Sequence, residues 1–499
     1  APILATASPP RLNAILSMAT GHKETIKRED SASHPASASP RKLLFLGLAL
    51  LLFLLIYFFL PVQDTDPQNA TQIRGGLALL ALAATLWLTE ALPLAVTALL
   101  VPVAATLSGS FPGTGKTIVA EAFSSFAHPL IFLFLGGFAL AAALSRQGLD
   151  RWIAHGILSR TGGSFLWSGV ALFGVAAGLS MWISNTASTA LLLPVALGML
   201  SDLRENSGQD TAKRAAPFLL LGLAYAASIG GLGTIIGTAP NAFSAALLNI
   251  DFVGWLKIGI PCVLILLPLM VLLLALITKP HTIPPVPLQK LDFHFNRDRI
   301  ATLVVFLLAV TAWILSGPLS KALGITSNFD SIISIAALVL LCALQLVRWR
   351  DIDRTTDWGV LLLFGGGLTL SKVLESTGSS AYLAELLRAF TEGWPFFLLV
   401  GAVVLFVIFL TELSSNTATT ALFAPIFLQV GLSLGVDPVK LVLPLTLAAS
   451  CAFMLPVATP PNAIVFGSGL IPQRSMMRIG IRLNLAFVAI LTLLSAILF

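Results

Sequence analysis

The residues best suited to bind small ions form a tripeptide, Ser-Asn-Thr, that the chain contains twice. One copy opens SNTASTALLLP at Ser184 and the other opens SNTATTALFAP at Ser415, so that eight of the eleven positions are identical. All three side chains compete with the backbone for hydrogen bonds and are unfavourable inside a helix. Their hydroxyl and amide oxygens are neutral ligands that suit a hard cation such as Na⁺. The repeated tripeptide therefore predicts two equivalent cation-binding elements.

A second pair of motifs interrupts apolar segments further along the chain. SIGGLGTIIGTAPN covers residues 228–241 and is rich in glycine, whereas CAFMLPVATPPN covers residues 451–462 and contains three prolines. Both residue types are unfavourable in a helix interior. An interrupted helix leaves carbonyl oxygens that can coordinate a cation and N–H groups that can bind an anion. The four motifs together predict two cation sites, one per repeat, that flank one anion site.

Fixed positive charge is absent from these motifs, since none of them contains Arg, Lys or His. A multiply charged anion in the middle of a membrane would have a large desolvation cost without compensating charge. Bound cations would supply that charge, and the motifs therefore favour cation-coupled binding of an anion. They contain no nucleophile–base pair and no His or Cys cluster, so neither an enzyme nor a metalloenzyme is indicated.

An alternative interpretation of the tripeptides needs no ligand. Ser and Thr in membrane helices often bond their own backbone, and small residues help helices to pack. That explains one Ser-Asn-Thr, but not two copies that are each followed by Pro-Asn-Ala. Two acids in apolar surroundings, Glu90 and Glu412, are further candidates for function. Glu90 lies beside an expected interfacial turn and fits a structural role, whereas Glu412 could tune the second cation site or bond a neighbouring helix.

Composition places the chain in a lipid bilayer. Of its 499 residues, 57% are hydrophobic and 10% are charged, and the mean hydropathy is +0.92. A soluble domain carries about 25% charged residues. The net charge of +6 is explained by basic residues in loops, with no nucleic-acid partner. All three cysteines lie in apolar runs, which argues against a disulfide framework.

Eleven segments are long and apolar enough to be expected as crossing helices. They are 43–60, 75–91, 93–108, 123–145, 215–248, 253–278, 299–317, 327–348, 356–375, 438–471 and 477–498. Two amphipathic segments, 149–161 and 380–391, are expected at the membrane interface. The tripeptides lie in segments 164–201 and 395–433, which are each too long for one crossing. Each is predicted to form a re-entrant hairpin with Ser-Asn-Thr at its tip, and a pair of crossings is the alternative.

The positions of Lys and Arg orient the chain. If the N-terminus is cytoplasmic and both hairpins return to their starting side, most basic residues fall in cytoplasmic loops and the C-terminus lies outside a bacterial inner membrane. The predicted cytoplasmic residues are Arg41, Lys42, Arg146, Arg151, Arg160, Lys279, Lys290, Arg297, Arg299, Arg348, Arg350, Arg354, Arg474 and Arg478. The predicted external residues are Arg74, Lys116 and Lys321.

The repeat extends well beyond the tripeptides. LFLGGFALAAAL at Leu133 matches LFGGGLTLSKVL at Leu363, and GTIIGTAPNA ending at Ala242 matches MLPVATPPNA ending at Ala463. The first Gly-rich helix is predicted to run toward the cytoplasm and its copy to run away from it. An inverted repeat of this kind is typical of secondary transporters, which bind substrate near the bilayer midplane.

The N-terminal residues 1–40 are rich in Ser, Ala and Pro and are predicted to be a disordered tail. The first methionine is Met18, so residues 1–17 are expected to be an artificial leader.

Paired Ser-Asn-Thr motifs, each followed by a break that ends in Pro-Asn, resemble those of the divalent anion/Na⁺ symporter family, whose members carry di- and tricarboxylates. The resemblance covers about residues 43–499, and both motifs occur twice and in order. It implies an all-α polytopic membrane protein with eleven transmembrane helices and two opposed re-entrant hairpins. It also implies a homodimer and an elevator mechanism, in which a transport domain carries substrate and Na⁺ across the bilayer against a scaffold.

The resemblance implies a division of the chain into scaffold helices, interfacial helices and two halves of a transport domain. The expected segments are the tail 1–40, scaffold helices 41–145, an interfacial helix 146–163, the first transport half 164–278, a cytoplasmic loop 279–298, scaffold helices 299–379, an interfacial helix 380–394 and the second transport half 395–499.

The resemblance also assigns site residues. The first Na⁺ site would use Ser180, Ser184, Asn185 and the backbone carbonyl of Gly233, and the second would use Thr411, Ser415, Asn416 and the carbonyl of Ala458. The substrate carboxylates would meet Asn185, Thr186, Asn416 and Thr417, with Thr234, Thr459 and Pro460 nearby. Thr234 and Thr459 each follow the small cation-site residue, but the Pro-Asn-Ala alignment places Thr238 opposite Thr459. The sequence is compatible with both registers.

The expected function follows from the intact tips. Family members that prefer sulfate often depart from Ser-Asn-Thr at one tip, whereas both copies are complete here. The resemblance therefore implies import of C4-dicarboxylates such as succinate, malate or fumarate, coupled to Na⁺ and without an organic cofactor. A Na⁺-independent dicarboxylate exchanger and a citrate or sulfate carrier of the same family are the alternatives. An ion channel is not indicated, because no continuous polar stripe could line a pore.

Overall fold

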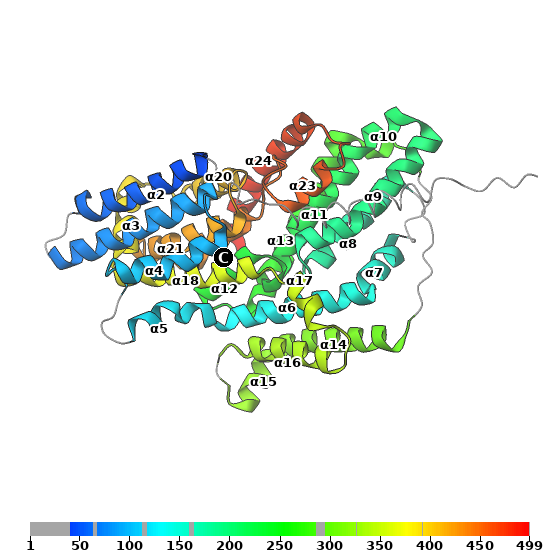
Figure 1. Ribbon diagram of the computed structural model, residues 1–499. Helices are drawn as coiled ribbons and strands as arrows, with labels where there is room; N and C mark the ends of the chain where they lie inside the picture. The colour runs from blue at the N-terminus through cyan, green and yellow to red at the C-terminus, as the bar shows by residue number, and fades with distance from the viewer. Residues whose placement is uncertain are drawn as a thin grey trace, which may run out of the picture.

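The computed structural model describes residues 40–62, 67–111, 117–158, 164–285, 295–325, 327–391 and 393–498, and within these ranges every regular element is a helix (Figure 1). The predicted tail, apart from Pro40, lies outside the described residues, as do Lys116, Arg160 and Lys290 of the charge pattern. The helices of the first half are α2 (Pro40–Phe59), α3 (Pro67–Thr89), α4 (Leu94–Leu107), α5 (Ile118–Phe123), η1 (Ser124–Ala127), α6 (Pro129–Gln147), α7 (Leu149–Leu158), α8 (Phe165–Ser180), α9 (Asn185–Ser207), α10 (Gln209–Ala216), η2 (Pro217–Leu221), α11 (Gly222–Gly230), η3 (Gly231–Gly233), η4 (Ile235–Gly237), α12 (Ala239–Leu248), α13 (Phe252–Thr278) and η5 (Pro280–Thr282). Those of the second half are α14 (Arg297–Ile314), α15 (Ser316–Leu323), α16 (Phe329–Ala343), α17 (Trp349–Thr355), α18 (Trp358–Ser376), α19 (Ser379–Phe390), α20 (Phe396–Thr411), α21 (Asn416–Ser433), α22 (Val439–Ala449), α23 (Pro460–Phe466) and α24 (Gln473–Leu498).

Eight helical spans of the described chain are long and apolar enough to cross a membrane, and the bent pair α14–α15 would add a ninth. Three of the eleven expected crossings contain an apolar helix of only 10–17 residues, namely α4, α16 and α22, and the first arms of the two predicted hairpins, α8 and α20, are equally short. α14 and α15 are bent by 75° where they meet. The number eleven therefore stays a prediction.

Each Ser-Asn-Thr lies where one helix ends and the next begins. α8 ends at Ser180 and α9 begins at Asn185, and α20 ends at Thr411 and α21 begins at Asn416. The serine of each tripeptide is the N-cap of the second helix. Its hydroxyl accepts a hydrogen bond from the backbone N–H three residues later in the chain, at 3.2 Å in the first copy and 3.4 Å in the second. The helix-unfavourable tripeptide thus starts a helix instead of interrupting one.

The glycine- and proline-rich motifs break their helices in the same manner. α11 ends at Gly230, and two short 3₁₀ turns separate it from α12. α22 ends at Ala449, and ten residues without regular structure precede α23 at Pro460. Both short helices follow a threonine N-cap in extended conformation, Thr238 and Thr459, and both have proline in the first turn. Proline is favourable there, because the N–H it lacks has no partner within the helix.

Corresponding helices of the two repeats make corresponding contacts. α6 packs against α16 and α18 packs against α4, and glycine permits both contacts. A Cβ built on Gly136 would lie 2.5 Å from Ser334 of α16, and one built on Gly366 would lie 2.5 Å from Ala98 of α4. Close approach of this kind favours helix association in lipid, where van der Waals packing replaces the hydrophobic effect.

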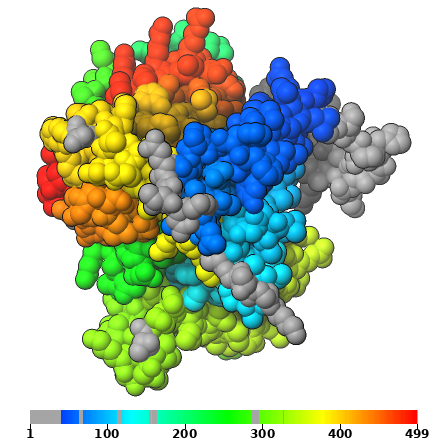
Figure 2. Space-filling view, turned by 90° about the vertical axis from the view of Figure 1, so that its left-hand side faces the viewer, coloured from blue at the N-terminus to red at the C-terminus, as the bar shows by residue number. Residues whose placement is uncertain are grey.

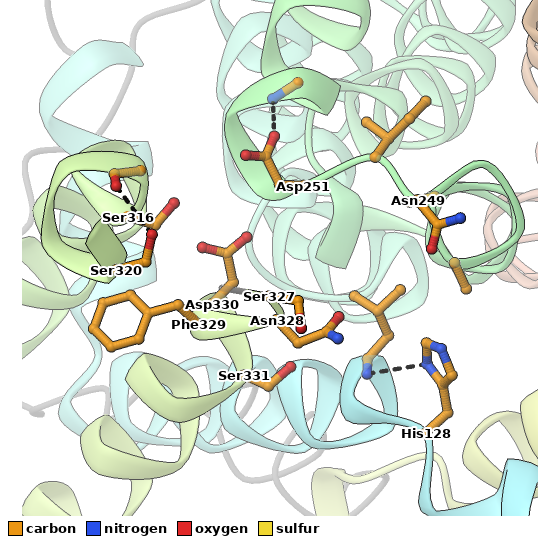
Figure 3. A pocket seen from close by; sticks show the side chains of 16 residues that line it. His128, Asn249, Asp251, Ser316, Ser320, Ser327, Asn328, Phe329, Asp330 and Ser331 are labelled. Atoms are coloured by element: carbon orange, nitrogen blue, oxygen red, sulfur yellow. Dashed lines mark hydrogen bonds between the residues drawn. The ribbon is translucent and has the colours of Figure 1, made fainter. Parts of the chain in front are cut away.

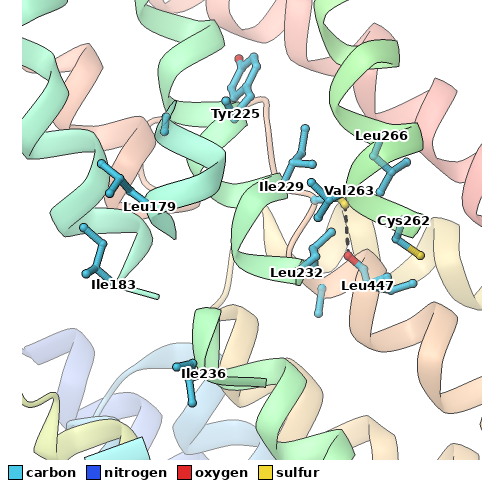
Figure 4. Packing of buried hydrophobic residues seen from close by; sticks show 14 of the residues in the cluster. Leu179, Ile183, Tyr225, Ile229, Leu232, Ile236, Cys262, Val263, Leu266 and Leu447 are labelled. Carbon is cyan, nitrogen blue, oxygen red and sulfur yellow. Dashed lines mark hydrogen bonds between the residues drawn. The ribbon is translucent and has the colours of Figure 1, made fainter. Parts of the chain in front are cut away.

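Segments distant in sequence lie side by side on one face of the molecule (Figure 2). The N-terminal helices adjoin the region of residues 350–430, since α3 contacts α18, α19 and α21. α2 lies at the outside of this group, and only 6% of its apolar stretch is buried inside the protein. The interior includes one large buried cluster, to which Leu179 and Ile183 of the first hairpin, Ile229 and Leu232 of the first break and Val263 of α13 belong (Figure 4). That packing fixes the first hairpin against the first break.

Candidate functional site

The first hairpin tip contacts the first helix break directly. Ser180 donates a hydrogen bond from Oγ to Oδ1 of Asn185 at 2.5 Å, which links the two arms of the hairpin. The Thr234 hydroxyl donates to the carbonyl oxygen of Met181 at 2.5 Å. A Cβ built on Gly231 would lie 2.5 Å from Oδ1 of Asn185, so a larger residue there would displace the Asn185 amide. Three residues that the resemblance assigns to binding, Ser180, Asn185 and Thr234, are therefore brought together.

Gly233 lies beside the same tip, but its carbonyl oxygen lies close to α13. A Cβ on Gly233 would meet the Met181 side chain at 2.9 Å, and a Cβ on Gly259 of α13 would lie 2.8 Å from the Gly233 oxygen. Trp255 of α13 also donates from Nε1 to the carbonyl of Leu232 at 3.0 Å. The first break is thus held between the hairpin tip and α13.

The asparagine of each Pro-Asn-Ala bridges its own helix break. Asn241 donates from Nδ2 to the carbonyls of Gly231 at 2.9 Å and Thr234 at 2.7 Å. Asn462 donates in the same way to Ala452 at 3.0 Å and Leu455 at 3.1 Å. The acceptors lie ten and seven residues before the asparagine in both repeats.

This shared pattern settles the register that the sequence left open. It pairs Thr234 with Leu455 and Thr238 with Thr459, as the Pro-Asn-Ala alignment requires. The pairing of Thr234 with Thr459 is therefore wrong as a structural equivalence. Thr234 and Thr459 nevertheless make similar local contacts. Each hydroxyl accepts a hydrogen bond from the backbone N–H three residues later, that of Gly237 at 3.0 Å and that of Asn462 at 3.3 Å. Each of these threonines follows a small residue, which is a local sequence pattern. When the two breaks are aligned on Pro-Asn-Ala, the two occurrences of this pattern lie about one helical turn apart.

The second hairpin tip is more enclosed than the first. Ser184 and Thr186 of the first tip are exposed, whereas Ser415 and Thr417 of the second are half-buried. Asn416 is half-buried as well, and its Oδ1 is buried without a hydrogen-bond partner among the described residues. An unpaired buried oxygen costs about 1–3 kcal/mol, so this atom is a ready ligand for a cation or an N–H group.

The remaining predicted residues of the second site come from the end of α20 and from the end of the second break. The Thr411 hydroxyl is buried and donates to the carbonyl of Ile408 at 3.1 Å, which leaves its lone pairs available. Ala458 and Thr459 are buried, and Pro460 is exposed at the start of α23.

The two repeats meet through the second arms of the hairpins. α9, which begins at the first tripeptide, packs against α23 of the second repeat. α21, which begins at the second tripeptide, packs against α12 of the first repeat. Each hairpin thus contacts the short helix of the other repeat. This reciprocal packing is the geometry that a shared anion site between the repeats would need.

Sequence reasoning gave no role to three buried amides and left Glu412 undecided. Asn241 and Asn462 close the breaks, and Asn484 of α24 donates to the Glu412 carboxylate at 2.7 Å. The identical asparagine in both repeats was a usable signal for the first two. Asn484 lies in an apolar helix with no repeated motif, so only the tertiary structure identifies it. Glu90, in contrast, is exposed in the turn after α3, where a structural role was expected.

A cavity of about 540 Å³ lies at a different place, between the start of α6, the connection from α12 to α13, and α15–α16 (Figure 3). Asp251 and Asp330 line it together with several serine and asparagine residues. The described residues that line this cavity include no Lys, no Arg and no predicted site residue. A dicarboxylate would meet like charge in this cavity, so the hairpin tips remain the better candidate.

Comparison with known proteins assigns the chain to a family. The sequence profile described as the sodium:sulfate symporter transmembrane region matches residues 41–499. An uncharacterised transporter of Haemophilus influenzae is 44% identical over 453 residues, which cover 89% of this chain and 95% of the relative. The sodium-dependent dicarboxylate transporter SdcS of Staphylococcus saprophyticus is 34% identical over 480 residues, which cover 88% of each chain.

The solved structures add evidence on the fold. The crystal structure of the YdaH transporter of Alcanivorax borkumensis aligns with a TM-score of 0.55 at 15% identity, covering 91% of this chain and 97% of that one. At this identity the likeness concerns the fold alone. The profile match and the curated relatives confirm the resemblance to divalent anion/Na⁺ symporters. The chain therefore belongs to the sodium:sulfate symporter transmembrane-region family and is an integral membrane transporter, not an enzyme.

Proposed function

We propose that this protein is a secondary active transporter that imports C4-dicarboxylates such as succinate, malate or fumarate together with Na⁺. The observation that carries the proposal is the duplicated arrangement of tip and break, in which two polar hairpin tips each adjoin an interrupted helix. The relative named as a sodium-dependent dicarboxylate transporter, at 34% identity, supports both the coupling ion and the substrate class.

The first Na⁺ site of this proposal lies at the first tip, with Ser180, Ser184 and Asn185 and the carbonyl of Gly233. Ser180 and Asn185 already share a hydrogen bond of 2.5 Å, so a cation would exchange that contact for ligation. The second Na⁺ site comprises Thr411, Ser415, Asn416 and the carbonyl of Ala458. There the unpaired Oδ1 of Asn416 needs no rearrangement to become a ligand.

The substrate in this proposal lies between the tips. One carboxylate would meet Asn185 and Thr186, and the other would meet Asn416 and Thr417. Thr234, Thr459 and Pro460, from the two breaks, would border the same space. No Lys, Arg or His occurs in the motifs, so two bound Na⁺ would offset the two negative charges of the substrate.

The conformational part of the proposal is an elevator in a homodimer. Residues 41–145 and 299–379 would form the scaffold, and 164–278 and 395–499 would form the transport domain. The two halves would be inverted in the membrane, with the N-terminus cytoplasmic and the C-terminus outside. The contacts of α6 with α16 and of α18 with α4 support the scaffold assignment, because they tie both scaffold segments together.

The test is uptake of labelled succinate into proteoliposomes, with Na⁺, Li⁺ or K⁺ outside and with or without dicarboxylate inside. Symport predicts uptake that needs external Na⁺ and no internal dicarboxylate. Uptake that needs internal dicarboxylate and ignores Na⁺ would establish an exchanger instead. Competition by unlabelled malate, citrate and sulfate in the same vesicles would rank the substrates, and sulfate as the strongest competitor would contradict the C4-dicarboxylate assignment.

A further inference from the structure

Glu412 is a buried carboxylate at the base of the second hairpin tip, three residues before Ser415. It is 3% exposed and lies directly after the last residue of α20. Its Oε1 accepts the backbone N–H groups of Phe453 at 2.7 Å and Met454 at 2.9 Å, and its Oε2 accepts that of Leu455 at 2.9 Å. The amide of Asn484 donates to Oε1 at 2.7 Å. All four partners are donors, which an ionised carboxylate can accept and a protonated one could not fully use.

These bonds fix the second break to the second hairpin. Three successive N–H groups that point at one carboxylate form an anion-binding turn of the backbone. The carbonyls of the same stretch are also held, since Phe453 accepts from the Tyr225 hydroxyl at 2.7 Å and Leu455 accepts from Asn462 at 3.1 Å. The break is therefore rigid on both of its sides.

The charge of Glu412 has no basic partner in the described part of the chain. The ion pairs there are Arg146 with Asp351 and Arg388 with Glu385, both at exposed positions on other elements. A buried charge without a counter-ion is costly even when it is hydrogen-bonded. The negative end of the α20 dipole adds to the same negative potential. The negative electrostatic potential at the second tip thus favours binding of a cation.

The first repeat makes the equivalent connection without any charge. Alignment of the tripeptides places Met181 opposite Glu412, and the asparagine bridges place Thr234 opposite Leu455. In the first repeat the Thr234 hydroxyl donates to the Met181 carbonyl at 2.5 Å. In the second repeat Leu455 has no hydroxyl, and its N–H donates to Glu412 instead. The two repeats therefore join the same two positions, once with a neutral bond and once with a carboxylate.

We propose that Glu412 is a positioning residue for the second Na⁺ site, and that its negative charge makes this site bind Na⁺ more tightly than the first. The inference rests on the proposed Na⁺ coupling and deepens it. Glu412 holds the break that carries Ala458, and the bound Na⁺ serves as its counter-ion. The two hairpin tips consequently carry the same tripeptide but differ in the charge beside it.

The experiment measures Na⁺-dependent thermal stabilisation of the purified full chain in detergent without substrate. The wild type is expected to bind Na⁺ in two phases of unequal affinity. Glu412→Gln removes the charge at nearly constant size. In the higher-affinity phase, we expect this variant to need at least about tenfold more Na⁺ for half-maximal stabilisation. The reason is that a nearby negative charge attracts a bound cation strongly at low dielectric.

A second variant separates charge from structure. E412M/L455T copies the first repeat, because it restores a threonine hydroxyl opposite a methionine carbonyl. We expect this variant to regain the wild-type melting temperature without Na⁺ while keeping the raised Na⁺ requirement. Glu205→Gln, which removes an exposed acid near the end of α9, serves as the matched control and should leave both quantities unchanged.

Three outcomes would overturn the inference. They are a wild type whose two Na⁺ sites are equal in affinity, a Glu412→Gln protein whose Na⁺ requirement stays within twofold of wild type, and an E412M/L455T protein that recovers the wild-type Na⁺ requirement. The first needs no variant to fold. Failure of the underlying transport proposal is recognised separately, since a wild type that Na⁺ does not stabilise, and that takes up succinate without Na⁺, would show it before any variant is made.

Discussion

Four asparagine side chains lie at the hairpin tips and helix breaks of the candidate site, and they divide into two kinds. Asn185 and Asn416 lie at the hairpin tips, where an amide can turn toward a ligand. Asn241 and Asn462 lie in the short helices and bridge carbonyls of the breaks. The first pair is suited to binding and the second pair to holding the backbone, so their removal should have different consequences.

Replacement of the tip amides should abolish transport while the fold is retained. Asn185→Ala and Asn416→Ala each remove one side chain that is proposed to bind both Na⁺ and substrate, and we expect succinate uptake to fall at least about tenfold in each. The measurement is initial uptake into proteoliposomes at matched protein content. Asn69→Ala, at an exposed position of α3, is the control. Near-normal uptake in either tip variant would refute its assignment.

Replacement of the bridging amides should act on stability first. Asn241→Leu and Asn462→Leu keep the volume but remove two hydrogen bonds each. The carbonyls of Thr234 and Leu455 still accept a backbone N–H, so the loss falls on those of Gly231 and Ala452, at a cost of about 1–3 kcal/mol for a buried group left unpaired. We expect a lower melting temperature in both variants, measured in detergent by thermal unfolding. If either variant melts as the wild type does, the bridge in that repeat is not structural.

At the scale of elements, the glycines of the two matched helices decide how closely the helices approach. α6 contacts α16 at Gly136, and α18 contacts α4 at Gly366. A helix is otherwise weakened by glycine, by roughly 1 kcal/mol relative to alanine. Glycine at these positions is therefore explained by packing and not by helix propensity.

Gly136→Ala and Gly366→Ala should both destabilise the protein, because a Cβ at either position would lie 2.5 Å from the facing helix. Gly174→Ala in the middle of α8 is the matched control, since its Cβ would meet nothing within 4 Å. We expect that control to be neutral or slightly stabilising. Thermal unfolding of the three variants checks the expectation, and an unchanged melting temperature for Gly136→Ala would contradict the close contact.

At the scale of the whole molecule, aromatic side chains join the first hairpin to α14. The rings of Trp182 and Trp313 are stacked with centroids 6.4 Å apart, and Phe252 of α13 stacks on Trp313 at 4.8 Å. The carboxylate of Asp330 in α16 accepts the backbone N–H of Phe252 at 2.9 Å. If α13 and the hairpin move against α14 and α16, as an elevator requires, these contacts must break in every transport cycle.

A cross-link between Trp182→Cys and Trp313→Cys should therefore stop uptake. The background is a transport-competent variant without the three native cysteines, and a short bifunctional thiol reagent forms the link. Phe134→Cys with Phe364→Cys, whose parent rings lie 5.4 Å apart within the proposed scaffold, is the control that should tolerate linking. Full uptake by the linked Trp pair would exclude relative motion at this contact.

The sequence by itself determined the class of protein and the identity of the polar motifs. Low charge and long apolar runs require a bilayer, and a duplicated helix-unfavourable tripeptide needs surroundings other than lipid. The helix breaks were also predictable, because glycine and proline act locally on the backbone. These are short-range effects, and each can be derived from a few neighbouring residues.

Only the tertiary structure decided which partners the buried polar groups find. The register between the breaks became definite through Asn241 and Asn462, whose longer bonds reach a carbonyl ten residues earlier in the chain, across each break. The contacts of Glu412 with the second break and Asn484 cross 41 to 72 residues. The sequence offers no local pattern for such pairings, because a buried donor or acceptor is satisfied by whichever group the packing of helices brings within hydrogen-bonding distance.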